Sequence, residues 1–136
     1  MAIQFSTTVR NAMLDAIETA IGTSAVLKIR TGAAPANCAT ADSGTVLATI
    51  TLGSDWAAAA SGGTKAWSSL PVSDLLADNT GTAAHFRLYA SDGTTCHEQG
   101  TVTATGGGGD IEVITTSFTQ NQPFNITAWT WTAPNA

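Results

Sequence analysis

The sequence predicts a mainly β protein, an antiparallel β-sandwich or jelly-roll-like body with one N-terminal amphipathic α-helix. Three observations predict it: one stretch with helical periodicity, several runs with strand periodicity, and turns rich in glycine between them. The 136 residues are expected to form a single domain, 1–136, with the helix at about 7–21, the β body at about 25–132 and a short C-terminal tail at 133–136.

Apolar residues recur at the spacing of one helix face between Ser6, a plausible N-cap, and Gly22, a plausible C-terminal stop. The apolar stripe consists of Val9, Ala12, Met13, Ala16, Ile17, Ala20 and Ile21. The opposite face carries Arg10, Asp15, Glu18 and Thr19. We therefore expect the stripe to pack on the sheet and the charged face to contact water.

The first strand is expected at residues 25–30, with Lys28 and Arg30 pointing outward. Residues 31–44 are small, polar and interrupted by glycine and proline, which is typical of a surface loop, and loops of this length often form interfaces. A second strand follows at 45–52. We expect a hairpin about Gly62 and Gly63, although the alanine run at 57–60 could equally form one turn of helix. A short helical turn is expected in 71–79, beginning near Ser73.

The clearest hairpin joins residues 83–90 to residues 94–104 through a three-residue loop, 92–94. This register places one apolar set on the core side: Phe86, Leu88, Ala90, Cys96, Val102 and Ala104. It places His85, Arg87, Tyr89, His97 and Gln99 on the solvent side. Glu98 is the one discordant residue on the apolar side, so either a bulge turns it out or it pairs with a cation.

The last strands are expected at 111–118 and 123–132, after a flexible glycine-rich connection at 105–110. Along the second of them, Phe124 and Ile126 share one face whereas Trp129 and Trp131 have the opposite parity. Such a switch requires a bulge, or a strand that is buried on both sides, one of them by another chain.

Charge and hydropathy exclude several classes of function. Only 11% of residues are charged and the formal net charge is −5, which argues against nucleic-acid binding because phosphate recognition needs clustered cations. No apolar run approaches the length of a membrane helix, and no signal peptide is evident, so we expect neither membrane insertion nor secretion.

No pattern in the sequence predicts catalysis, a metal or a cofactor. Cys96 and His97 are strand neighbours that point to opposite faces, and a metal site that combines His85 and His97 with Glu112 or Asp110 is much less favoured than two solvent-facing histidines. Cys38 and Cys96 are expected to be reduced, and a bridge between them is left as an open alternative. The four tryptophans fit core or interface positions better than a sugar-stacking platform.

One part of the chain resembles a known group of proteins. The stretch TTVRNAMLDAIETAIGTSAVLKIRTGAAPANCATADSGTVLATITL, followed by DWAAAASGG, resembles small structural proteins encoded among the virion genes of tailed bacteriophages and prophages. The resemblance covers about the first half of the chain, and the Thr- and Gly-rich second half is similar in character only. It carries no catalytic motif and assigns no residue a role. It implies a virion component that is made in the cytoplasm of the bacterial host.

The resulting functional hypothesis is a capsid decoration or cement protein, with a tail, fibre-adaptor or receptor-binding module as the rival and a small hydrolase or metal protein as a distant third. The expected partners are the major capsid protein or another virion protein, and further copies of this chain in a dimer or trimer. The residues expected at the contact are Pro35, Asn37, Trp129, Trp131 and Pro134, because the sequence gives their segments no internal role.

Overall fold

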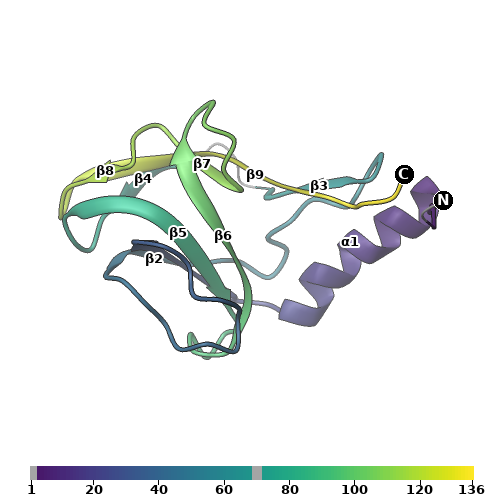
Figure 1. Ribbon diagram of the computed structural model, residues 1–136, viewed down its shortest axis with the longest axis horizontal. Helices are drawn as coiled ribbons and strands as arrows, with labels where there is room; N and C mark the ends of the chain where they lie inside the picture. Colours follow the sequence, from purple (N-terminus) through teal and green to yellow (C-terminus); the bar gives the residue numbers. More distant parts are fainter. Residues whose placement is uncertain (1–2, 69–71) are drawn as a thin grey trace.

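The computed structural model describes residues 3–68 and 72–136, and this part of the chain is mainly β with one N-terminal helix and a curled mixed sheet that forms a half-barrel (Figure 1). The elements are α1 (Thr7–Ile21), β1 (Val26–Thr31), β2 (Val46–Thr51), β3 (Thr64–Ala66), β4 (Val72–Leu76), β5 (Gly81–Tyr89), β6 (Cys96–Ala104), β7 (Ile111–Val113), β8 (Ser117–Phe118) and β9 (Pro123–Thr132). The predicted fold class is confirmed. The sheet is mixed because β6 and β7 run parallel, whereas their neighbours pair antiparallel.

The strand order is β2-β1-β5-β6-β7-β9-β3, with β4 also paired to β9 and β8 to β5. The segment predicted as one strand at 111–118 is thus divided into β7 and β8, which pair with different partners. The helical turn predicted near Ser73 is wrong, because residues 72–76 form β4 along β9. Residues 69–71, which include the first residue of the segment 71–79, lie outside the described residues.

The bounds of α1 are those predicted from its caps. The Ser6 side chain accepts a hydrogen bond from the backbone N–H of Val9 at 3.3 Å. At the other end Gly22 has a φ of 91°, and its N–H donates to the carbonyl of Glu18 at 2.9 Å. In Figure 1 the helix lies at one end of the molecule, near both chain termini and β3.

The β5–β6 hairpin forms as predicted, but its register slips by one residue near the turn. Leu88 pairs with Glu98 and Tyr89 with Cys96, so His97 is the extra residue of a bulge. Cys96 therefore shares the face of Tyr89, and its predicted place in the apolar set is wrong. Glu98 keeps the predicted core side.

Bulges and tight turns bring tryptophans from distant segments into one cluster. Gly62 and Gly63 have φ values of 61° and 78°, as a two-residue hairpin turn requires, and Ala57 then bridges to Trp67. Opposite β7, the pairing skips Thr127, which is the bulge that the switch in parity predicts. Trp129 consequently faces the core, and its ring lies 6.1 Å from that of Trp56 and 5.7 Å from that of Trp67.

The glycine-rich connection between β6 and β7 is more ordered than predicted. The Glu112 carboxylate accepts the N–H groups of Gly106 and Gly108 at 3.2 and 3.3 Å. The Thr103 hydroxyl accepts the N–H of Gly109 at 2.9 Å. These hydrogen bonds fold the connection back alongside β6. The chain can therefore begin β7 parallel to β6 after only a short connection.

Candidate functional site

The helix α1 is attached to the β body by its polar side. Asn11, Asp15 and Glu18 accept the backbone N–H groups of Gly63, Ala60 and Ala57 at 2.8, 2.9 and 3.2 Å. These N–H groups belong to the segment around the Gly62–Gly63 turn, which supplies no acceptor for them in a sheet ladder. The helix side chains therefore complete the hydrogen bonding of a segment far away in sequence.

Lys65 is the centre of this attachment. Its ammonium group lies 2.8 Å from the Asp15 carboxylate and 3.2 Å from that of Glu18, and it donates to the carbonyl of Ala58 at 2.9 Å. The residue is only 4% exposed. Burial disfavours its charged form, but the two carboxylates outweigh burial and raise the pKa of Lys65 above its usual value. The cation is therefore retained, and it fixes which side of α1 faces inward.

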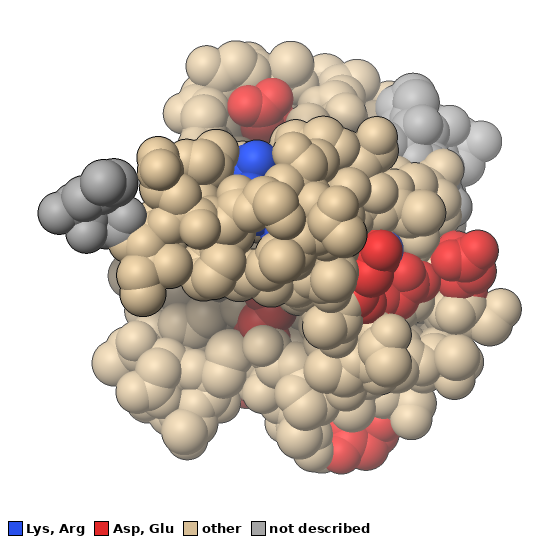
Figure 2. Space-filling model, turned by 90° about the vertical axis from the view of Figure 1, so that its right-hand side faces the viewer, with Lys and Arg blue, Asp and Glu red and all other residues tan. Residues whose placement is uncertain are grey.

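This orientation confirms the prediction that the apolar stripe packs on the sheet for Ile17 and Ile21 only, and contradicts it for the rest of the stripe. Of the stripe, Ile21 is buried and Ile17 is half-buried. The remaining five residues are exposed, and they are called the outer stripe here: Val9, Ala12, Met13, Ala16 and Ala20. Val9 and Met13 are 43% and 42% exposed. Figure 2 views the molecule from this side and shows a mostly uncharged surface.

Two adjoining hollows run beside the outer stripe and are called the helix groove here. One has a volume of about 370 Å³ and is lined by Ile17, Ala20, Ile21, His97, Glu98 and Trp131. The other has a volume of about 460 Å³ and is lined by residues that include Met13, Leu14, Ile17, Trp131 and Pro134. Because Ile17 and Trp131 line both, the hollows form one apolar channel between α1 and the β6 and β9 strands.

Two carboxyl groups line the helix groove, Glu98 in the first hollow and Asp110 in the second. The Trp131 indole N–H donates to Glu98 Oε1 at 2.8 Å, whereas Glu98 Oε2 is buried without a hydrogen-bond partner. The discordant Glu98 therefore has one neutral donor in place of the cation or outward bulge expected from the sequence. Burial raises the pKa of Glu98 to about 7, despite that hydrogen bond. The groove thus contains a carboxyl that is protonated below neutral pH.

The structure separates the predicted interface residues into three groups. Trp129 is 1% exposed within the tryptophan cluster, so its predicted place at a contact with another chain is wrong for this fold. Trp131 and Pro134 line the helix groove. Pro35 and Asn37 belong to the loop between β1 and β2 and line neither hollow of the helix groove.

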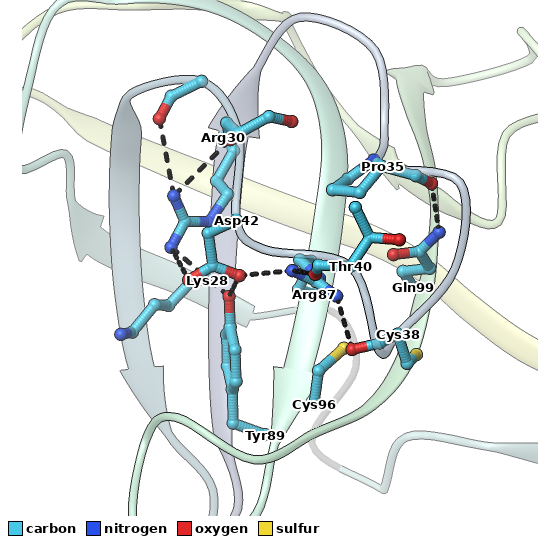
Figure 3. A network of polar contacts seen from close by, with 12 residues as sticks. Lys28, Arg30, Pro35, Cys38, Thr40, Asp42, Arg87, Tyr89, Cys96 and Gln99 are labelled. Atoms are coloured by element: carbon cyan, nitrogen blue, oxygen red, sulfur yellow. Dashed lines mark hydrogen bonds and ion pairs between the residues drawn. The ribbon is translucent and has the colours of Figure 1, made fainter.

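Residues 32–44, called the covering loop here, lie over the outer face of β1, β5 and β6 (Figure 3). Pro35 and Asn37 use their carbonyls internally: they accept hydrogen bonds from Gln99 at 2.6 Å and from Arg87 at 3.2 Å. The Asn37 side chain accepts from the N–H groups of Ala39 and Thr40, which shapes the loop. Both residues therefore have internal roles that the sequence did not reveal.

Beneath the covering loop lie residues that the sequence placed toward solvent. Arg30, His85, Arg87 and Tyr89 are all buried, so that prediction is wrong. The Asp42 carboxylate forms ion pairs with both guanidinium groups and accepts the Tyr89 hydroxyl at 2.7 Å. Burial opposes the ionisation of Asp42, but the Tyr89 hydrogen bond and the two arginines outweigh it and lower its pKa.

The described residues contain no group of three or more potential metal ligands. His85 is buried, with Nδ1 2.6 Å from the Gly32 carbonyl, whereas His97 borders the helix groove, so the two histidines do not share a surface. Trp56, Trp67 and Trp129 are buried, which leaves no tryptophan platform for a sugar. None of the helices in the described part of the chain is long and apolar enough to span a membrane.

Comparison of the chain with protein-family models, with curated proteins and with solved structures gives no significant match.

Proposed function

We propose that this chain is a non-enzymatic structural protein of a tailed-bacteriophage virion, a capsid decoration or cement protein that binds and stabilises the capsid lattice. One observation carries the proposal. The helix α1 uses its charged residues for attachment to its own β body and leaves the outer stripe and the helix groove uncovered. An apolar face that the fold itself does not use is typical of a surface for another protein.

The chemistry of this face favours an apolar protein partner. The outer stripe has no charged side chain, and Trp131 and Pro134 extend it across the helix groove. Aromatic side chains at the centre of a patch are typical anchors of protein contacts. The partner we propose is the major capsid protein or another virion protein, which this chain binds as a homo-oligomer, a dimer or trimer.

The proposal does not require strong individual contacts. A capsid presents many identical subunits, and copies of this chain that bridge them multiply weak contacts through effective concentration. Because so few charges lie at the face, the contact should persist at high salt. The resemblance of the first half of the sequence to phage virion proteins supports the same assignment.

The test is to prepare particles that lack this protein, to add it back and to measure capsid survival under heat or osmotic shock. Wild-type protein should bind and protect the capsids, and Met13→Asp should abolish binding because it places a charge in the outer stripe. Thr8→Asp, an exposed position of the same helix outside the stripe, is the matched control and should bind normally.

Unchanged capsid stability, with the protein present only on isolated tails, would reject the cement function and favour the tail, fibre-adaptor or receptor-binding alternative. Self-association that Met13→Asp abolishes, without any binding to particles, would assign the outer stripe to a second copy of the chain alone.

A further inference from the structure

The two cysteines of the chain meet where the covering loop crosses β6. Cys38 belongs to the covering loop and Cys96 is the first residue of β6. Figure 3 shows the two residues next to each other at the same end of the polar network under the loop. The Cys96 thiol donates to the Glu98 carbonyl at 3.3 Å. The bulge that turns Cys96 to the face of Tyr89 places it near Cys38, because the regular register would direct the thiol into the core.

The loop is fastened to the sheet on both sides of this contact. Arg87 donates to the Cys38 carbonyl at 2.9 Å and to the Thr40 carbonyl at 3.0 Å. Gln99 donates to the Pro35 carbonyl at 2.6 Å. The backbone around Cys38 is therefore held in place over β6, so a side-chain rotation can bring the Cys38 thiol to that of Cys96 without a search by a mobile loop.

Both thiols are free and half-buried, so a small reagent can reach them. They differ in environment. Burial, followed by the neighbouring Cys38 thiol, raises the pKa of Cys96 to about 11, and the charge of Arg87 offsets this only in part. Cys96 is thus a poor first nucleophile, since thiol exchange requires the thiolate.

We propose that Cys38 and Cys96 form a cross-linking site that reacts with small disulfides such as oxidised glutathione and fastens the covering loop to β6. The Cys38 thiolate attacks one sulfur of the small disulfide and releases the other half as a thiolate, which leaves a mixed disulfide on Cys38. The Cys96 sulfur, after losing its proton to solvent, then attacks Cys38 Sγ and expels the second small thiolate. Two protein thiols are oxidised and one small disulfide is reduced to two thiols.

The cross-link changes how the covering loop is held. In the reduced chain, the loop depends on the hydrogen bonds and ion pairs to Arg30, Arg87, Tyr89 and Gln99. In the oxidised chain it is also tied covalently to β6. A reducing compartment would leave the loop able to open, and an oxidising one would close it permanently. This inference rests on the loop geometry and is independent of the proposed binding to a capsid.

The experiment incubates the purified full-length chain with excess oxidised glutathione and follows intact mass, thiol content and thermal unfolding. We expect monomeric chains that have lost two hydrogens, no titratable thiol, and a Tm higher by about 10 °C that returns to its starting value on reduction. Cys96→Ser should stop at the mixed disulfide on Cys38, and Cys38→Ser should react with glutathione more slowly.

Three results would overturn the inference. In the first, both cysteines of the wild-type chain keep stable glutathione adducts. In the second, cross-links form between chains rather than within one, and in the third the thiols persist in excess oxidised glutathione. An internal cross-link that left Tm unchanged would refute its role in fastening the loop. Faster reaction of Cys38→Ser than of Cys96→Ser would reverse the assigned order of attack.

Discussion

Two segments of this molecule, α1 and the covering loop, are held against the same β body by ion pairs to buried cations. The ratio of cations to carboxylates is reversed between the two attachments. At α1, one buried cation, Lys65, faces two carboxylates supplied by the helix. Under the covering loop, two buried cations, Arg30 and Arg87, face one carboxylate supplied by the loop. In both cases the cation belongs to the sheet and the acid belongs to the segment that is attached.

The two attachments leave different surfaces. The covering loop shields a polar face of the sheet and presents small polar residues to solvent, so the region is complete in a single chain. The helix turns Glu18 toward the buried Lys65, leaves the Asp15 side chain 49% exposed and presents the outer stripe to solvent, so that region is left incomplete. A buried cation therefore has a different consequence in each place. Under the covering loop it helps to cover a polar face of the sheet, and at α1 it orients the helix so that an apolar face is exposed.

The largest expected effect is at the covering loop. Asp42→Ala leaves two buried guanidinium groups and the Tyr89 hydroxyl without their shared acceptor. It should lower the free energy of unfolding by about 3 kcal/mol. This estimate is near the lower limit for breaking a buried ion pair, since the Asp42 side chain is 39% exposed and solvent screens its charge. Chemical denaturation measures the loss. Asp78→Ala, at an exposed acid, is the control and should have little effect.

If Asp42→Ala lowered the free energy of unfolding as little as the control does, the covering loop would not be held by its buried charges. The comparison between the two attachments would then fail.

Glu98 provides a contrast to the acids of the two attachments, because it is largely buried and has no cation as its partner. Its folded-state pKa of about 7 lies above the value of 4.5 for an ordinary glutamate, so the folded state binds the proton more tightly. The corresponding stability is present below pH 4.5 and is lost as the pH rises through about 7. Relative to Glu98→Gln, the wild-type chain should lose about 2 kcal/mol between pH 5 and pH 8.

Denaturation of both proteins across this range measures the difference directly. Effects shared by the two chains cancel, including that of His85, whose pKa burial lowers and whose contribution has the opposite sign. Parallel stability curves for wild type and Glu98→Gln would show that the carboxyl is ionised in the folded chain without cost.

Local patterns in the sequence predicted most of the fold. The caps at Ser6 and Gly22 defined α1, because capping is a property of adjacent residues. The parity switch before Trp129 predicted the bulge in β9 for the same reason. The extra residue at His97 was not predicted, because the apolar pattern favoured a regular register with Cys96 on the core side, whereas the bulge turns Cys96 to the face of Tyr89.

The orientation of α1 could not be predicted because its determinants are distant in sequence. Lys65 and Asp15 are 50 positions apart, and Arg87 and Asp42 are 45 positions apart. Helical periodicity shows that an apolar face exists, but it does not show whether that face meets the chain's own sheet or another molecule. The interface prediction therefore named Trp129, which the core uses, and omitted Met13, which the fold leaves exposed.

The central claim is that α1 faces the β body with Asp15 and Glu18 together with Leu14 and Ile21, and faces solvent with the outer stripe. Thermal unfolding of Glu18→Ala and Ala16→Asp, at a protein concentration low enough to prevent self-association, tests it most directly. Glu18 is 18% exposed in its side chain and serves Lys65 and Ala57, so its loss should cost about 1 kcal/mol and lower Tm by a few degrees. Ala16 is exposed, so the new aspartate should cost only the difference in helix propensity, about 0.6 kcal/mol, and lower Tm by less than Glu18→Ala does. A large loss for Ala16→Asp together with no change for Glu18→Ala would show that the apolar stripe is packed on the sheet and would contradict this account.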